Sequence, residues 1–285
     1  MDTQLKGIKW MLIASFTLSI ISLLMSKAEI TIGLIQSYFI MCITITIIAA
    51  SLIYIKNKSF STNFATSYII RAFSTASSML LWFYVLRLLP VNELTAISYM
   101  TPLLNVIAGV VIFKEYINIK RIIAVFIGFI GMLIIIKPVF LGEFYSYSMA
   151  ILTILIWVIG DILIKSQTSQ DTTLIQIFYV YLAISFMLMP MAIFQWQVPT
   201  SMDMIYCVLI GLLQFINFYA IFKAYKYSPL SVVVPFDFSR MLFTLSITYI
   251  LFNEGISGSA FTGAMLIVGA TIYLVQHVKR SYYIE

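Results

Sequence analysis

A series of long apolar stretches runs through the whole chain and restricts the folds that it can adopt. A helix needs about 20 apolar residues to cross the hydrocarbon core of a membrane. The sequence contains ten stretches of roughly this length, separated by short polar segments. They lie at 8–26, 32–55, 67–88, 91–113, 119–136, 147–166, 173–195, 203–225, 230–252 and 258–277. We therefore expect an all-α polytopic membrane protein with ten transmembrane helices.

The composition indicates that lipid, rather than water, is the solvent for most of the chain. It is 62% hydrophobic and 10% charged, whereas a soluble domain is about 45–50% apolar and about 25% charged. Such a chain cannot hide its apolar surface in a single core. The first stretch, from Ile8 to Met25, is longer than the core of a signal peptide, and no small-residue cleavage motif follows it. We expect it to be retained as the first span.

The basic residues of the loops and chain ends gather on one side of this arrangement. With the N-terminus inside, the inner side receives Lys6, Lys9, Lys56, Lys58, Lys114, Lys120, Arg121, Lys165, Lys223, Lys226, Lys279 and Arg280. The outer side receives only Lys27, Arg87 and Lys137. An excess of Lys and Arg is typical of cytoplasmic loops. We therefore expect both termini to be cytoplasmic.

Other features of the composition argue against several kinds of site. The net charge of +6 is spread over short loops, which disfavours nucleic acid as a partner. Cys42 and Cys207 lie in apolar stretches, where free thiols act as small hydrophobes, and their spacing suggests neither a disulfide nor a metal site. The one histidine, His277, ends the last stretch, so we expect no metal site and no catalytic base built on histidine.

The two halves of the chain, 1–138 and 139–285, repeat a common frame. Pro90 precedes Glu115 by 25 residues, and Pro229 precedes Glu254 by the same interval. With five spans in each half, the second half starts on the opposite face of the membrane. The halves are then inverted repeats, an arrangement that places the binding sites of many transporters near the midplane.

The segment from Leu89 to Pro138 resembles the EamA-type transporters of the drug/metabolite transporter superfamily. Their pattern of prolines, a terminal glutamate, an arginine and a glycine-rich span is met by Pro90, Pro102, Glu115, Arg121, Gly128, Gly131 and Lys137-Pro138. Lys223 to Glu254 is similar to the family's equivalent block in the second half. Within the family, the chain length and the Pro-Phe-Asp-Phe-x-Arg run that begins at Pro235 are most similar to S-adenosylmethionine uptake transporters.

This resemblance implies a fold of two inverted five-helix repeats around a central cavity, with no bound cofactor. The cavity would be lined mainly by spans 1, 3, 4, 6, 8 and 9. The last span of each half would brace the fold or form a homodimer, and its glycines would allow close packing of helices. Gly263 and Gly269 are spaced differently from Gly128 and Gly131, so the alignment of the repeats is poorest there.

Asp237 and Arg240 are the strongest candidates for binding a substrate. Ionisable groups within a span are costly, so they usually face a cavity or a partner. The two residues are three apart in a span, which places them on one helix face. We expect the pair to bind a zwitterionic or polar substrate, or to take up and release a proton. The alternative is a salt bridge that only holds helices together.

Asp161 and Arg71 also stand out among the ionisable residues within spans. Asp161 could line the cavity, with Lys165 four residues later reaching the cytoplasmic interface. Arg71 begins the third span, where it could line the pathway or simply reach the interface. Glu115 and Glu254 stand at span ends, and we expect structural roles for them.

Polar and aromatic residues of spans 3, 4 and 8 could also line the cavity. They are Trp82, Tyr84, Tyr99, Asn105, Gln214, Asn217 and Tyr219. Aromatic rings could stack on a flat or cationic ligand, although ordinary packing explains any single one equally well. Pro102 and Pro235 lie inside spans 4 and 9, where we expect them to bend the helices.

The sequence favours a secondary transporter of the bacterial inner membrane. The cargo would be a small polar organic metabolite resembling S-adenosylmethionine, a nucleoside or an amino acid. No nucleotide-binding loop is visible, so a gradient or an exchange would drive transport. An exporter of amino acids or drugs with the same fold is an alternative. An intramembrane aspartyl protease using Asp161 and Asp237 is another, although the expected Gly-x-Gly motif is broken by Val158.

Overall fold

The computed structural model of the protein describes residues 2–27, 31–115, 119–137, 143–252 and 258–280. All secondary structure in these residues is helical, as the hydropathy pattern predicts. The helices are α1 (Asp2–Lys27), α2 (Leu34–Ile55), α3 (Ala65–Val85), α4 (Val91–Ser98), α5 (Thr101–Val111), α6 (Ile119–Ile136), α7 (Phe144–Gln167), α8 (Thr173–Phe194), α9 (Ser201–Tyr227), α10 (Leu230–Val233), the 3-10 helix η1 (Val234–Phe238), α11 (Ser239–Phe252) and α12 (Gly258–Arg280).

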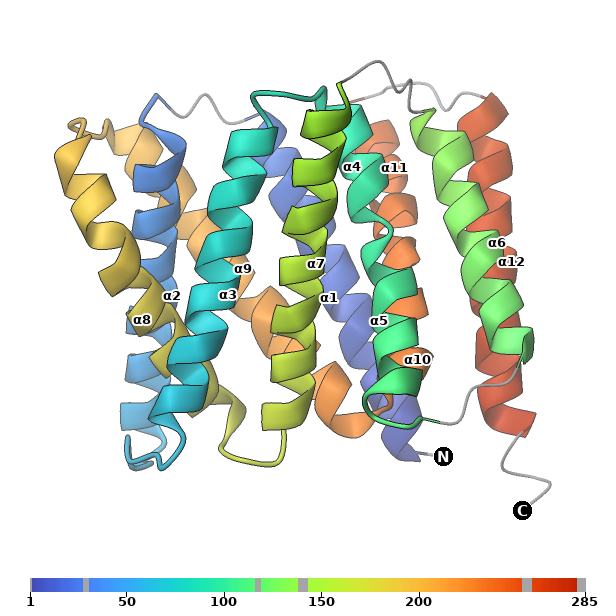
Figure 1. The fold of residues 1–285 in the computed structure, drawn as a ribbon, viewed down its shortest axis with the longest axis horizontal. Helices are drawn as coiled ribbons and strands as arrows, with labels where there is room; N and C mark the ends of the chain where they lie inside the picture. The colour runs from blue at the N-terminus through green and yellow to red at the C-terminus, as the bar shows by residue number, and fades with distance from the viewer. Residues whose placement is uncertain (1, 28–30, 116–118, 138–142, 253–257, 281–285) are drawn as a thin grey trace.

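The helices stand side by side in two rows (Figure 1). Contacts between neighbours define one row as α8, α3, α7, α4 with α5, and α6. They define the other as α2, α9, α1, α10 with η1 and α11, and α12. Contacts across the rows are strongest at the two ends, where α2 packs on α8 and α6 packs on α12. The middle of the slab is therefore the place where the rows can separate.

The two rows are exchanged when each helix of the first half is replaced by its counterpart in the second half. The contact of α1 with α9 becomes that of α7 with α3, and the contact of α2 with α9 becomes that of α8 with α3. In Figure 1 α1 rises from the lower end of the slab, whereas α7 descends from the upper end. The halves thus run in opposite senses, and α1 begins at the same end at which α12 ends.

Two of the expected spans are broken near their middle, one in each half. In the first half α4 ends at Ser98 and α5 begins at Thr101, with Pro102 in its first turn, where a missing N–H is tolerated. In the second half Pro235 lies in η1, between α10 and α11. The expectation that the prolines distort these spans is confirmed. Repeat-related helices are interrupted at repeat-related positions.

Seven segments of the described residues are long and apolar enough to cross a membrane. They include the composite segments Glu93–Val111 and Leu230–Leu251. Shorter apolar stretches lie within α6 and α12, and α3 carries several Ser and Thr side chains. The all-helical fold is therefore confirmed, whereas ten crossings stays a prediction.

Glycines bring α6 and α12 into close contact. A Cβ atom added to Gly263 would lie 2.4 Å from the backbone oxygen of Gly131, and one added to Gly131 would lie 2.8 Å from that of Gly263. At Gly128 an added Cβ would lie 2.9 Å from the ring of Phe238. The expected close packing is confirmed at these positions. It is wrong for Gly269, where an added Cβ would meet nothing within 4 Å, because this residue faces away from α6.

We expect Gly263→Ala to destabilise the fold, because the added methyl meets backbone rather than a movable side chain. The loss should be about 1–3 kcal/mol, the usual range for overpacking. Thermal unfolding of the purified protein in detergent measures it. Gly269→Ala is the matched control on the same helix, and it should unfold at the same or a slightly higher temperature because Ala favours a helix. Equal unfolding temperatures for the two variants would contradict the assignment of this contact.

Candidate functional site

The break in the second half places two charged residues at the centre of the slab. Asp237 lies in η1 and Arg240 in the first turn of α11. Irregular backbone at membrane depth is tolerated where it is buried in protein or lines a cavity. Both side chains keep 20% of their surface exposed, although most of the neighbouring residues are buried. The break thus directs a pair of opposite charges at an accessible space.

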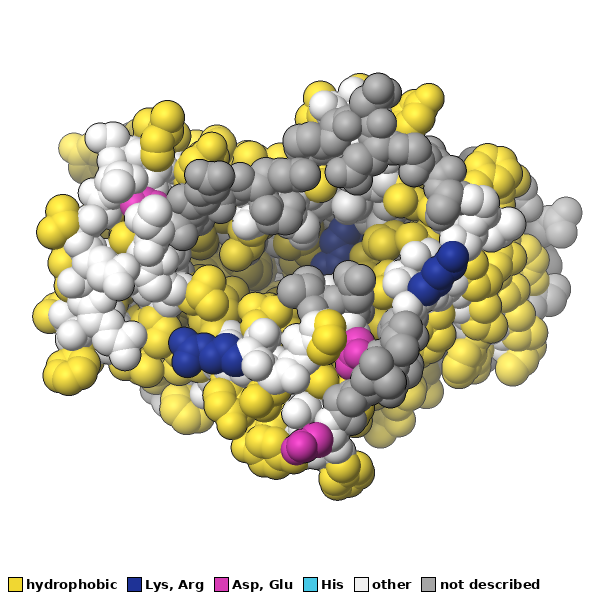
Figure 2. All heavy atoms as spheres, turned by 90° about the horizontal axis from the view of Figure 1, so that it is seen from above, with side chains coloured by type: hydrophobic (Ala, Val, Ile, Leu, Met, Phe, Trp, Pro, Cys, Tyr) yellow, Lys and Arg dark blue, Asp and Glu magenta, His cyan; other side chains and the backbone are white. Residues whose placement is uncertain are grey.

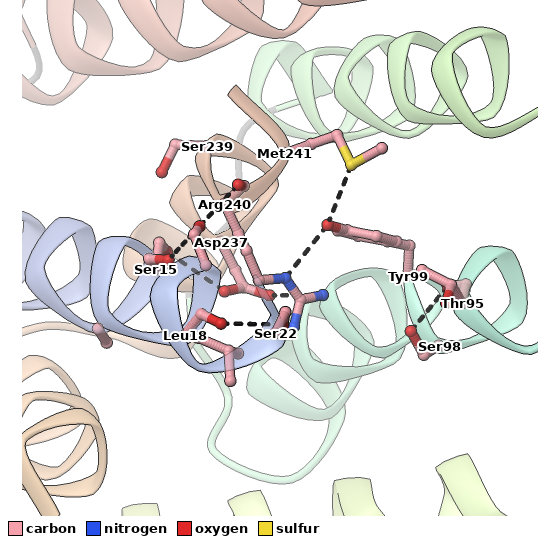
Figure 3. Close-up of polar contacts among 12 residues, drawn as sticks. Ser15, Leu18, Ser22, Thr95, Ser98, Tyr99, Asp237, Ser239, Arg240 and Met241 are labelled. Atoms are coloured by element: carbon pink, nitrogen blue, oxygen red, sulfur yellow. Dashed lines mark hydrogen bonds and ion pairs between the residues drawn. The ribbon is translucent and has the colours of Figure 1, made fainter. Parts of the chain in front are cut away.

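The ion pair itself is loose. Arg240 Nη2 lies 3.7 Å from Asp237 Oδ2, across one helical turn. The hydroxyl of Ser15 in α1 donates to Asp237 Oδ1 at 3.3 Å (Figure 3). A bidentate contact between a guanidinium and a carboxylate would be shorter and would use two hydrogen bonds. Arg240 therefore keeps donor capacity for a further anionic group.

Tyr99, at the break in the first half, is the second partner of Arg240. Arg240 Nε donates to the Tyr99 hydroxyl at 3.1 Å, and the guanidinium carbon lies 4.5 Å from the ring centroid. The Tyr99 ring stacks on Phe238 with centroids 6.2 Å apart and planes 15° apart. Tyr99 and Phe238 occupy the same place in the two halves, each nine residues after Pro90 or Pro229. The two breaks therefore meet through repeat-related rings.

Serines of α1 form the third wall of this site. Ser15, Ser19 and Ser22 follow one another at spacings of four and three residues, which places them on one helix face. The Ser19 hydroxyl donates to the backbone oxygens of Ser15 and Arg240, both at 2.8 Å. Ser22 is exposed and lies toward the Arg240 guanidinium (Figure 3). These serines were not predicted as site residues, although their spacing in the sequence could have indicated a shared face.

Asp161 is more deeply buried than Asp237 and Arg240 and does not take part in their ion pair. It is 7% exposed, and Asn105 of α5 donates its side-chain amide to Asp161 Oδ2 at 2.6 Å. Asp161 is thus an interior carboxylate bound to the neighbouring helix.

Three other expected site residues make contacts between helices elsewhere. Arg71 is 2% exposed, donates to Gln167 Oε1 at 2.8 Å and lies over the Phe222 ring at 4.5 Å, so it does not reach the membrane interface. Asn217 donates to the backbone oxygen of Ala14 in α1 at 2.8 Å. Trp82 meets Trp157 of α7 edge-on, with centroids 6.4 Å apart.

Two charged side chains, one from each half, hold the α9–α10 hairpin at the lower end of the slab. Lys165 Nζ donates to the backbone oxygens of Tyr225 and Ser228, both at 2.7 Å. The Glu115 carboxylate accepts the backbone N–H groups of Leu230 and Ser231, both at 2.8 Å. The expected structural role of Glu115 is confirmed. The Lys165 ammonium binds the C-terminal carbonyls of α9 at this end of the slab, and its reach to the membrane interface stays a prediction.

The opposite, upper end of the slab is open. Figure 2 shows this face hollowed between the rows of helices. One basic side chain lies in the hollow, and few other charged side chains are visible on the face. The described residues contain no cluster of His, Cys, Asp and Glu that could hold a metal ion. The residues around Asp237 and Arg240 thus present paired charges, hydroxyl groups and aromatic rings.

Comparisons with known proteins match the whole length of the chain. The sequence profile of the EamA-like transporter family matches residues 5–137 and again 144–276. The S-adenosylmethionine uptake transporter of Rickettsia prowazekii (strain Madrid E) is 23% identical over 99% of this chain and 96% of its own length. The riboflavin transporter of Vibrio cholerae is 25% identical over 97% of this chain and 95% of its own length. A solved crystal structure superposes with a TM-score of 0.83 at 16% identity, covering 96% of this chain and 98% of the other.

The aspartyl protease alternative finds no support in these comparisons. The similar proteins are named transporters, and the two aspartates have different partners, Asn105 for Asp161 and Arg240 for Asp237. The chain is thus a multi-pass membrane transporter for a small molecule, not an enzyme. With both halves matched by the family profile, it belongs to the EamA-like transporter family.

Proposed function

We propose that this protein is a ten-helix secondary transporter that carries a small zwitterionic or cationic metabolite across the bacterial inner membrane. The observation that carries the proposal is the loose, partly exposed pair of Asp237 and Arg240 at the broken helices. Charges at membrane depth are costly and mark substrate or ion pathways. The weakness of this pair favours an exchangeable contact rather than a permanent brace.

The chemistry of the pair suits a cargo with charges of both signs. Arg240 would hold a carboxylate through its unused donors, because a guanidinium matches the planar geometry of that group. Asp237 would hold an ammonium or another cation, and Tyr99 would present its hydroxyl. Asp161 would act on the cargo from a greater distance. We assign Arg71, Trp82 and Asn217 to helix packing in this conformation.

Alternating access would follow from the opposed halves. The upper end is hollowed and the lower end is held by Lys165 and Glu115, so this conformation would take up cargo from above. The lower loops and chain ends carry most of the basic residues, which supports a cytoplasmic lower end with both termini there. Release to the cytoplasm would require the α9–α10 hairpin to separate from these two side chains. A gradient or an exchange would drive the cycle.

The names of similar proteins indicate the first cargo to test. S-adenosylmethionine and riboflavin transporters both match nearly the whole chain. S-adenosylmethionine has a carboxylate, an ammonium and a sulfonium, which suits a site with one guanidinium and one carboxylate. It is therefore the preferred probe. Riboflavin is the comparison.

We expect Asp237→Ala and Arg240→Ala each to abolish exchange of S-adenosylmethionine, because each leaves the opposite charge without its partner. The loss should be about a hundredfold or more. Counterflow of labelled S-adenosylmethionine in proteoliposomes measures it. Arg87→Ala and Glu143→Ala, at exposed positions, are matched controls and should exchange at the normal rate. Normal exchange in both the Asp237 and the Arg240 variant would overturn the proposed function.

We expect Lys165→Met to shift the protein toward a lower-open conformation, because two backbone oxygens lose their donor when the lower end is closed. Loss of these charged hydrogen bonds should change the ratio of conformations by about tenfold. A cysteine at the exposed position 22, Ser22→Cys, reports the shift through its rate of thiol labelling from the upper side. The rate should fall in Lys165→Met and stay unchanged in Lys226→Met, since Lys226 is exposed. An unchanged labelling rate in both variants would contradict the role of Lys165 in closing the lower end.

A further inference from the structure

A separate cavity of about 150 Å³ lies between α1, α2 and α3. Its walls include Met25 from the upper part of α1, Tyr38 and Met41 from α2, and Met79 and Phe83 from α3. Because α3 belongs to one row and α1 and α2 to the other, the cavity lies between the rows. None of the residues expected from the sequence to bind substrate lines it.

The walls of this cavity suit a flat ring. Three methionines supply flexible, polarizable sulfur atoms, which make favourable contacts with aromatic edges. Tyr38 and Phe83 are already arranged edge to face, with centroids 6.0 Å apart and planes at 82°. An apolar cavity of about 150 Å³ is large enough to bind benzene. The volume and the lining thus fit one aromatic ring better than a hydrated polar group.

One face of α1 connects the cavity to the charged site. Ser15, Leu18, Ser22 and Met25 follow at spacings of three or four residues, so they lie along one stripe of the helix. Ser22 lies toward Arg240, as Figure 3 shows, and Met25 lines the cavity. The helix rises about 4.5 Å over the three residues that separate them. A ligand that occupies both places would therefore follow this face of α1 from the level of Ser22 to that of Met25.

We propose that this cavity is a second subsite, which holds a planar apolar ring of the cargo while Asp237 and Arg240 hold its charged end. The inference rests on the proposed function and narrows its substrate class. The cargo is a zwitterion or cation joined by a short linker to a flat ring system. A ringless amino acid leaves the cavity without a ligand group and binds through its charges alone.

Two fragments of the probe molecule test the two subsites separately. Adenosine carries the ring without the amino-acid end, and methionine carries the amino-acid end without the ring. Inhibition constants of both are measured against binding of labelled S-adenosylmethionine to the purified full-length protein in nanodiscs. Met79→Trp fills the cavity, so the inhibition constant of adenosine should rise by about tenfold. That of methionine should stay within about twofold of the wild-type value.

Met189→Trp, at an exposed position of α8, is the matched control and should change neither constant. Met41→Ala enlarges the cavity and should also weaken adenosine without affecting methionine, which guards against misfolding of the tryptophan variant. Failure of adenosine to inhibit the wild-type protein, or equal changes for both fragments in Met79→Trp and Met41→Ala, would overturn the subsite. Those outcomes leave the proposed function intact, because that function is overturned by a different result, which is normal exchange in the Asp237 and Arg240 variants.

Discussion

Every backbone N–H and C=O group at membrane depth needs a partner, and this requirement governs the structure around the broken helices. A span interrupted at its middle exposes amide and carbonyl groups that lipid cannot solvate. At the break in the second half, α1 of the first half supplies a partner, because the Ser19 hydroxyl donates to the backbone oxygen of Arg240. At the lower end of the slab, the Glu115 carboxylate accepts the amides that begin α10, and Lys165 donates to the carbonyls that end α9. Side chains thus complete the hydrogen bonds that the helix ends and the break leave open.

The same dependence explains how the charged residues are distributed. Lys165 and Glu115 are committed to backbone partners, and Asp161 is bound by Asn105. Asp237 and Arg240 differ, because their mutual contact is long and both side chains stay partly exposed. Lys165, Glu115 and Asp161 therefore stabilise the fold, whereas Asp237 and Arg240 keep hydrogen-bonding capacity that their mutual contact does not use. This difference, rather than the presence of charge alone, separates the proposed binding site from the scaffold.

Much of the architecture could be predicted from the sequence, since hydropathy and the Pro-to-Glu frame are local signals. Each expected span corresponds to a helix or to a broken pair of helices, and the prolines at 102 and 235 indicated the breaks. Asp237 and Arg240 were also accessible to this reasoning, because charge at membrane depth is rarely incidental, and Tyr99 was named only within a set of aromatic candidates. Their arrangement into one site was not accessible, because it depends on how the break after α4 meets η1 and α11 across the halves.

Other features depend on tertiary neighbours that no local pattern encodes. Lys165 was expected to reach the interface, and the sequence gives no sign that its ammonium also binds two α9 carbonyls. Gly269 was grouped with Gly263 because both are glycines of the last span, although only Gly263 faces α6. Arg71 was expected to line the pathway or to reach the interface, and it lies buried over the Phe222 ring. In each case the contacts depend on the direction in which the residue faces, and the spacing of residues in the sequence does not define that direction.

The two halves of the sequence differ at the position of Lys165, whose ammonium holds the α9–α10 hairpin. Counted from the paired prolines, the position that corresponds to Lys165 in the first half is occupied by Ser26, which cannot supply an ammonium. In the proposed alternating-access cycle, this difference would give the two conformations unequal free energies, and the carrier would rest mostly in one of them. The cargo concentration in the compartment that the resting conformation faces would then govern half-saturation, while the gradient alone would still determine the net direction of flow.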